Sequence, residues 1–220
     1  MDKYQDRQAA GKVLAKHLKE YANKANTLVL ALPRGGVPVA YEIASALNLP
    51  LDVFLVRKLG VPWHKELAMG AIASGGCKFF NQEVIESLVI SQDDIDKAIL
   101  KEEKELKRRE VLYRDNRAFP SFYNKNIILV DDGIATGSTM RAAIKALKNR
   151  KPASMLVAIP VAALATFKEM TSLVDRVICP LKPVHFYAVG MWYAHFPQIL
   201  DLEVTELLKK ANENYLANAS

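Results

Sequence analysis

The segment from Ile127 to Thr139 constrains the fold of this chain more than any other part of the sequence. Four apolar residues in a row, Ile127 to Val130, predict a strand buried on both faces, because a half-exposed strand would alternate with polar residues. Two acids, a turn rich in glycine and hydroxyl residues, and a helix-like segment over residues 140–148 follow directly. A strand, a small-residue loop and a helix N-terminus form an anion site, since free N–H groups and the positive end of the helix dipole face the loop.

The paired acids Asp131 and Asp132 narrow the ligand of this site. Two adjacent carboxylates repel a bare phosphate, but they suit a sugar phosphate, which carries phosphate at one end and hydroxyls or Mg²⁺ at the other. An ATP-type P-loop is disfavoured, because the loop has no lysine to reach the outer phosphates. Ordinary turn chemistry, with a helix cap at Gly137 and Ser138, is the alternative that needs no ligand.

The sequence from Val130 to Thr139 resembles the phosphoribosyl-pyrophosphate (PRPP) signature of type I phosphoribosyltransferases. The resemblance implies that Asp131 and Asp132 bind the ribose hydroxyls of PRPP. It also implies that five consecutive residues hold the 5′-phosphate: Ala135, Thr136, Gly137, Ser138 and Thr139. The 6-oxopurine enzymes of the family carry an aspartate where this chain has Ala135, so a hypoxanthine–guanine enzyme is disfavoured and no other base is selected.

Apolar runs alternate with helix-like segments along the chain. Strands are expected near residues 27–32, 51–56, 127–130, 154–159 and 174–179, and helices near 6–25, 37–47, 140–148, 161–171 and 197–216. This alternation predicts an α/β fold with a mostly parallel central sheet flanked by helices, of the type I phosphoribosyltransferase kind. The 220 residues suit one domain, with a small hood near residues 180–200.

Two further segments follow predicted strands, so we expect them at the ligand-binding edge of the sheet. Arg34 and Gly35, within Pro-Arg-Gly-Gly, offer a guanidinium and free N–H groups, and the resemblance implies a pyrophosphate loop, often with a non-proline cis peptide. Arg57 and Lys58 resemble the start of the flexible catalytic loop of adenine and orotate phosphoribosyltransferases, and we expect a flexible loop near residues 57–76. Its cations would neutralise the departing pyrophosphate. The alternatives are a tight turn and two solvated basic residues.

Aromatic residues gather between Cys179 and Phe196, where a planar base could stack. Lys182, Phe186 and Trp192 are the candidate base-binding residues, by a loose resemblance to the hood of 6-oxopurine enzymes. Packing of these aromatic rings in the core explains the pattern equally well.

The composition limits the remaining function classes. No apolar run approaches the ~20 residues of a membrane span, the first residues are polar, and two distant cysteines suit a reduced cytoplasmic protein. The net charge of +6 is compatible with a small polyanion. Basic residues between Lys97 and Arg117 alternate with glutamates, which favours a solvated helix over a nucleic-acid surface.

The sequence therefore predicts an enzyme of nucleotide metabolism, a pentosyltransferase that transfers ribose 5-phosphate from Mg²⁺-PRPP to a nitrogenous base and releases pyrophosphate. Mg²⁺ would be held mainly by PRPP oxygens and water, with no metal ligand assigned in the protein. A non-catalytic PRPP- or nucleotide-sensing regulator of the same fold is the chief alternative, and a sugar-phosphate hydrolase is a third. A homodimer is compatible with the sequence, which specifies neither the acceptor base nor the pathway.

Overall fold

The apolar runs form a parallel sheet at the centre of the molecule. The computed structural model describes residues 3–115, 117 and 119–219. The strands of the sheet are β2 (Leu51–Val53), β1 (Thr27–Ala31), β6 (Asn126–Val130), β7 (Ser154–Ala158) and β8 (Arg176–Ile178), in that spatial order, and every neighbouring pair is parallel. The segment that begins at Ile127 is thus the central strand, which confirms the predicted α/β fold.

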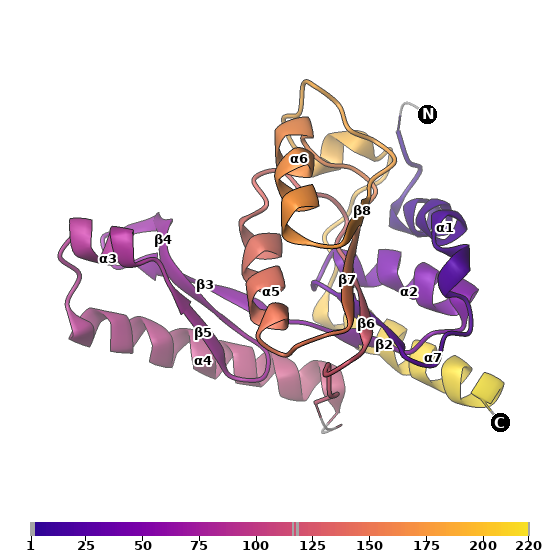
Figure 1. Cartoon of the computed structure of the whole chain (residues 1–220), viewed down its shortest axis with the longest axis horizontal. Coiled ribbons are helices and arrows are strands. Elements are labelled where there is room, and N and C mark those ends of the chain that lie inside the picture. The colour runs from indigo at the N-terminus through magenta and orange to yellow at the C-terminus, as the bar shows by residue number, and fades with distance from the viewer. Residues whose placement is uncertain (1–2, 116, 118, 220) are drawn as a thin grey trace.

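Helices cover both faces of this sheet (Figure 1). α1 (Arg7–His17), α2 (Gly36–Leu47) and α7 (Asp201–Ala219) lie on one face, while α5 (Ser138–Lys148) and α6 (Leu164–Leu173) lie on the other. Successive residues of a strand point to opposite faces, so Ile128 and Val130 enter one core, and Ile127 and Leu129 enter the other. Burial on both faces explains why β6 has no polar alternation.

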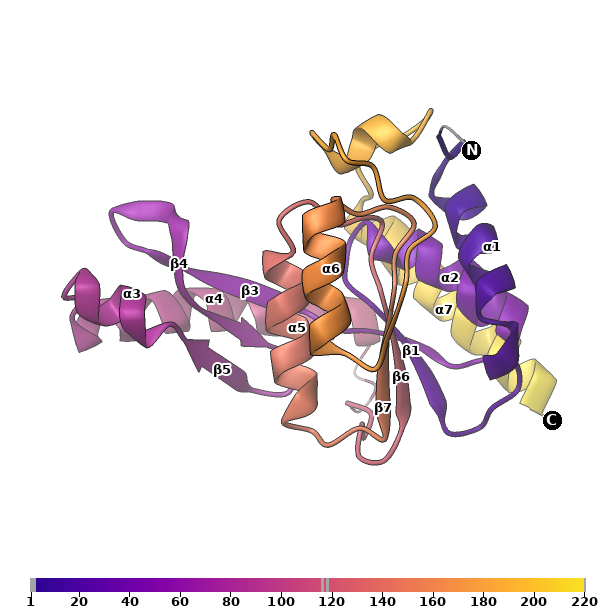
Figure 2. The ribbon, with the colours of Figure 1, turned by 45° about the horizontal axis from the view of Figure 1, so that its top comes forward.

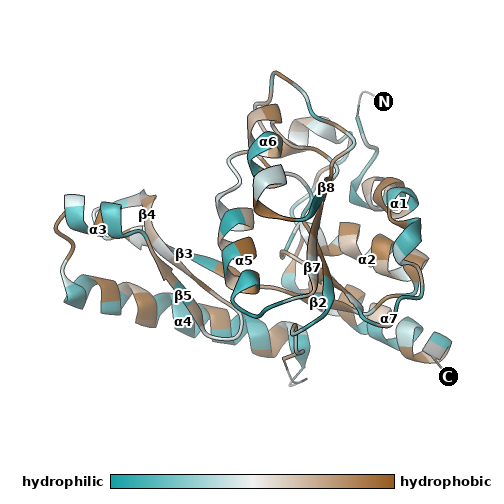
Figure 3. Ribbon diagram, viewed as in Figure 1, coloured by the Kyte–Doolittle hydropathy of each residue, from teal (hydrophilic) through white to brown (hydrophobic). Residues whose placement is uncertain are grey.

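An arm extends from this body (Figure 2). It consists of an antiparallel sheet of β3 (Val56–Val61), β4 (His64–Ala73) and β5 (Cys77–Phe80), with α3 (Gln82–Ser87) and the long α4 (Gln92–Arg114). Ser91 caps the charged helix α4, since its hydroxyl accepts the N–H of Asp94 at 3.2 Å. α4 is hydrophilic over much of its surface (Figure 3). Its last turn joins the body, where Arg114 donates to the backbone oxygen of Val53 at 2.9 Å.

The arm corrects the prediction for residues 57–76, which are not an irregular loop but mainly the two strands β3 and β4. The register of this strand pair shifts on both sides of Gly60, so the two-residue polarity period that marks a strand is interrupted. The expected strand over residues 51–56 likewise ends at Val53, because Val56 already belongs to β3. The flexibility of this segment remains a prediction.

Other boundaries differ on a smaller scale. The first helix ends at His17 and is followed by the 3₁₀ turn η1 (Lys19–Tyr21). α6 begins only at Leu164, because Val161 and Ala162 form single bridges to other segments. The hood region near residues 180–200 contains one 3₁₀ turn, η2 (Val189–Trp192), and packs on the N-terminal segment, where the Tyr4 N–H donates to the Trp192 oxygen at 2.9 Å.

Candidate active site

The carboxyl ends of the neighbouring strands β1 and β6 bring two predicted loops into contact. The peptide bond between Pro33 and Arg34 is cis, as the resemblance implied. A Cβ atom at Gly35 would lie 2.0 Å from Oδ2 of Asp132, and one at Gly36 would lie 2.7 Å from the backbone oxygen of Val130. Glycine is therefore needed at both positions for the first loop to lie directly against the paired acids.

The paired acids lie in a buried, asymmetric environment. Asp131 Oδ1 accepts the Asp132 N–H at 2.9 Å, and Asp132 Oδ2 accepts Nε of Arg7 at 2.8 Å. Burial is the main cause that raises the pKa of both carboxyls. The neighbouring charge of Asp132 raises the pKa of Asp131 further, whereas the cation of Arg7 opposes the rise at Asp132.

Arg7 is a site residue that the sequence did not reveal. It lies in the first turn of α1, and its Nη1 donates to the backbone oxygen of Pro197 at 2.8 Å. Its guanidinium carbon lies 3.7 Å from the centroid of the Phe196 ring, a cation–π contact. Arg7 thus connects the acids to the hood, but its position in an ordinary amphipathic helix, far from Asp132 in sequence, gave no signal of this role.

The Thr-Gly-Ser-Thr loop forms a small cradle at the start of α5. Gly137 adopts the left-handed conformation with φ of 77°, and the helix begins there without a side-chain cap. The Thr166 hydroxyl donates to the backbone oxygen of Ala135 at 2.7 Å and fixes the loop from α6. A cavity of about 130 Å³ lies here, lined by Asp131 and residues 133–140. Uncapped N–H groups at a helix N-terminus are suited to an anion.

Comparison with known proteins identifies the family of this chain. The family model described as "Phosphoribosyl transferase domain" matches residues 62–191. The chain belongs to the phosphoribosyl transferase domain family.

Its relatives include a crystal structure of TT1426 from Thermus thermophilus, which is 33% identical with a TM-score of 0.82, over 94% of this chain and 98% of that one. Two Mycobacterium tuberculosis proteins, from strains CDC 1551 / Oshkosh and ATCC 25618 / H37Rv, are each named "Putative phosphoribosyl transferase". Each is 38% identical over 215 residues, which cover 98% of this chain and 48% of the relative. The chain therefore spans about half the length of these relatives.

The two cations predicted to work together in this phosphoribosyl transferase domain lie on different sides of β3. Arg57 faces α4, where its Nη2 and Nε lie 2.6 and 2.8 Å from Oε2 of Glu102. Lys58 instead lines a hollow of about 720 Å³ between the arm and α5, together with Ser138 and Thr139 of the cradle. Adjacent residues of a strand point to opposite faces, so one strand cannot direct both cations to a single place.

The candidate base-binding residues lie in the hood of the phosphoribosyl transferase domain but are engaged with other groups. Phe186 and Trp192 stack on each other with ring centroids 6.4 Å apart and pack, partly buried, against a small apolar cluster. Lys182 donates to the backbone oxygen of Cys179 at 2.6 Å. The hood reaches the acids through Tyr193, whose hydroxyl donates to the Asp132 backbone oxygen at 2.5 Å.

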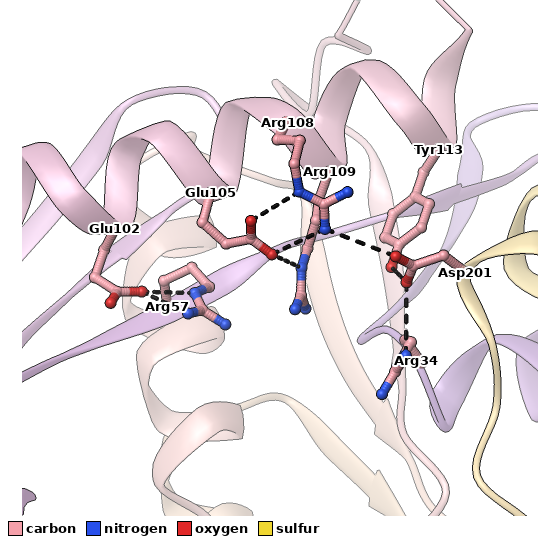
Figure 4. Close-up of polar contacts among 8 residues, drawn as sticks. All are labelled: Arg34, Arg57, Glu102, Glu105, Arg108, Arg109, Tyr113 and Asp201. Atoms are coloured by element: carbon pink, nitrogen blue, oxygen red, sulfur yellow. Dashed lines mark hydrogen bonds and ion pairs between the residues drawn. The ribbon is translucent and has the colours of Figure 1, made fainter.

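The Arg34 side chain lies beside Asp201, near the end of α4 that carries Tyr113 (Figure 4). Its Nη1 lies 3.7 Å from Oδ1 of Asp201, the first residue of α7, and Arg108 Nη2 lies 3.7 Å from Oδ2 of the same carboxylate. The Tyr113 hydroxyl donates to Asp201 Oδ1 at 2.5 Å. The sequence pattern predicted Arg108 and its neighbour Arg109 as parts of a solvated helix, because glutamates at helical spacing suggest surface ion pairs and no binding role.

Proposed function

We propose that this chain transfers the ribosyl phosphate of Mg²⁺-PRPP to a nitrogenous base and releases pyrophosphate. The observation that carries the proposal is the contact between the glycine loop and the paired acids, in which Gly35 lies against Asp132. Loop, acids and phosphate cradle adjoin at the carboxyl ends of β1 and β6. One ligand that carries a phosphate, ribose hydroxyls and a pyrophosphate would engage all three.

Each part has a separate task in this reaction. The N–H groups of residues 135–139 bind the 5′-phosphate, with the dipole of α5 behind them. Asp131 and Asp132 accept hydrogen bonds from the ribose hydroxyls, and the loop at Arg34 and Gly35 holds the pyrophosphate. As the bond to pyrophosphate lengthens, positive charge develops on the ribose, and the nearby carboxylates stabilise it. The base then attacks C1 from the opposite side, with inversion, and no protein nucleophile is required.

The donor set fits a magnesium ion that arrives with PRPP. Mg²⁺ is usually bound by one or two carboxylates, by substrate phosphates and by several waters. Asp131 and Asp132 supply carboxylate oxygens at the ribose end of the proposed site, so they are the residues that would complete the shell of such an ion. When bound, the ion neutralises charge on the leaving pyrophosphate.

The acceptor is proposed only as a nitrogenous base. Ala135 disfavours a 6-oxopurine, because this position offers no carboxylate to the base. Gly133 places the hood close to the acids, since a Cβ there would lie 2.5 Å from Cγ1 of Val189. The acceptor would enter between the acids and this part of the hood.

Cys77 and Cys179 are free thiols, in keeping with the cytoplasmic setting proposed for the reaction. No helix among the described residues is long and apolar enough to cross a membrane.

A screen of nucleobases with Mg²⁺-PRPP, which follows pyrophosphate release, tests this function. Release with at least one base, abolished by Asp131→Asn with Asp132→Asn, supports the transferase. Tight PRPP binding by calorimetry without release for any base would favour the regulator of the same fold. Turnover that survives the double substitution would contradict the roles of the two acids.

A further inference from the structure

Several arginines converge where the arm joins the body. Arg34 comes from the β1–α2 loop, Arg57 from β3, and Arg108 and Arg109 from α4 (Figure 4). Three carboxylates lie among these four guanidinium groups: Glu102, Glu105 and Asp201. The cluster therefore keeps an excess of positive charge beside the proposed pyrophosphate loop. Like charges gathered in this way favour an anionic ligand.

The pairs within the cluster differ in strength. Glu105 accepts Nε of Arg109 at 2.7 Å and Nε of Arg108 at 2.8 Å, within hydrogen-bond distance. Asp201, in contrast, lies 3.7 Å from both Arg34 and Arg108, beyond that distance. Since a long, partly exposed ion pair contributes little to stability, Arg34 can exchange Asp201 for a stronger anion.

Arg109 is the arginine of α4 that lies on the same side of the helix as Arg34 and Arg57 (Figure 4). Its side chain is 24% exposed, against 52% for the neighbouring Arg108. Figure 4 shows the side chains of Arg34, Arg57 and Arg109 directed to the same side of α4. The charges of Arg109 and Arg34 both oppose the rise in the pKa of Tyr113, a rise caused first by burial and then by Asp201. Both guanidinium groups therefore lie near the same tyrosine.

We propose that the arm supplies part of the pyrophosphate site, and that Arg109 of α4 binds the pyrophosphate group together with Arg34. This inference rests on the proposed function. A guanidinium can donate two parallel hydrogen bonds to phosphate oxygens, which is the geometry that a pyrophosphate group offers. Arg57 remains with Glu102, and Arg108 keeps Glu105 paired when Arg109 turns to the ligand. The long helix thus has a binding role besides its solvated face.

The test measures binding of inorganic pyrophosphate with Mg²⁺, PRPP and ribose 5-phosphate by calorimetry to the full chain and to three variants. Arg109→Ala should weaken pyrophosphate and PRPP binding about 10–100-fold, as expected when hydrogen bonds to a charged group are lost. Binding of ribose 5-phosphate, which lacks the pyrophosphate group, should stay unchanged and show that the variant is folded. Arg109→Lys should recover part of the affinity, because lysine keeps the charge but not the paired donors.

Lys107→Ala is the matched control, since Lys107 lies on the same helix two residues away, carries the same charge and is exposed. Its pyrophosphate affinity should remain within about twofold of the parent chain. Equal pyrophosphate affinity in Arg109→Ala and the parent, equal losses in the two alanine variants, or a parent chain that does not bind pyrophosphate would each overturn the inference. Selective loss in Arg109→Ala without transfer to any base would instead uphold this anion site and contradict the proposed function.

Discussion

Two arginine–aspartate contacts flank the candidate site, and they differ in nearly every physical respect. Arg7 and Asp132 lie 2.8 Å apart, with side chains only 8% and 14% exposed. Arg34 and Asp201 lie 3.7 Å apart, with side chains 30% and 31% exposed. The first contact fixes a carboxylate proposed to bind ribose, and the second holds a cation proposed to bind pyrophosphate. The candidate site thus has a rigid half around Arg7 and Asp132, proposed to bind the sugar, and an exchangeable half around Arg34 and Asp201, proposed to bind the leaving group.

The largest expected effect follows from breaking the rigid contact. Arg7→Ala leaves the Asp132 carboxylate buried without its cation, so the free energy of unfolding should fall by about 3–5 kcal/mol. Urea unfolding at pH 7 measures this change. The control is Arg176→Ala, which removes an ion pair to Glu20 whose side chains are 49% and 52% exposed. The control should lose less than about 1 kcal/mol. Similar losses in both variants would show that the two contacts do not differ as described.

A methyl group at Gly35 should disturb the rigid half next most strongly. Because a Cβ there would meet Oδ2 of Asp132 at 2.0 Å, Gly35→Ala must displace the acid or the loop, at about 1–3 kcal/mol. PRPP affinity, measured by calorimetry, should fall with it. Gly76→Ala serves as the control, since its added Cβ has no neighbour within 4 Å, although its φ of 77° carries some strain. Retained PRPP affinity in Gly35→Ala would separate the glycine loop from the ligand site.

The rigid half was partly predictable because its residues are consecutive in sequence. The unbroken apolar run predicts β6, since a central parallel strand needs no polar face, and the signature that follows it predicts the paired acids. The strands on either side were found for the same reason. Arg7 was not predictable, because its partner Asp132 lies 125 residues away and an arginine in a helix is ordinarily solvated.

The exchangeable half was only partly predictable from the sequence. The shifts of register around Gly60 concealed β3 and β4, so residues 57–76 were expected to be a loop. Glu105 pairs with Arg108 and Arg109 at helical spacing, a pattern that also occurs on any exposed helix. The contacts of Arg108 and Tyr113 with Asp201 distinguish this helix from a fully solvated one.

Removal of the Asp201 charge tests the exchangeable half. Asp201→Asn should cost no more than about 1 kcal/mol of unfolding free energy, because its ion pairs are long and partly exposed. It should also raise the affinity for inorganic pyrophosphate several-fold, since Arg34 no longer has a competing carboxylate. Calorimetry with Mg²⁺ and pyrophosphate measures the gain. Glu20→Gln, which removes an exposed ion pair at the amino end of β8, should leave that affinity unchanged. Weaker pyrophosphate binding in Asp201→Asn would contradict the exchange.

The smallest expected effect concerns pH, to which the two regions should respond with opposite sign. Hydrogen bonds from Arg108 and then Arg109 lower the pKa of Glu105 from 4.5 to about 2. A lowered folded-state pKa means that the stabilisation by Glu105 is present above the unfolded value and is lost as the pH falls toward 2. Glu105→Gln should therefore be slightly less stable than the parent at pH 7, and the difference should shrink by pH 3. Burial raises the pKa of Asp131 above its unfolded value, so its ionisation costs stability at pH 7 and this cost disappears as the pH falls. Asp131→Asn should therefore be more stable than the parent at pH 7, and this gain should shrink by pH 3. Urea unfolding of the three chains at both pH values decides this, and a Glu105→Gln difference that stays constant would rule out the assigned sign.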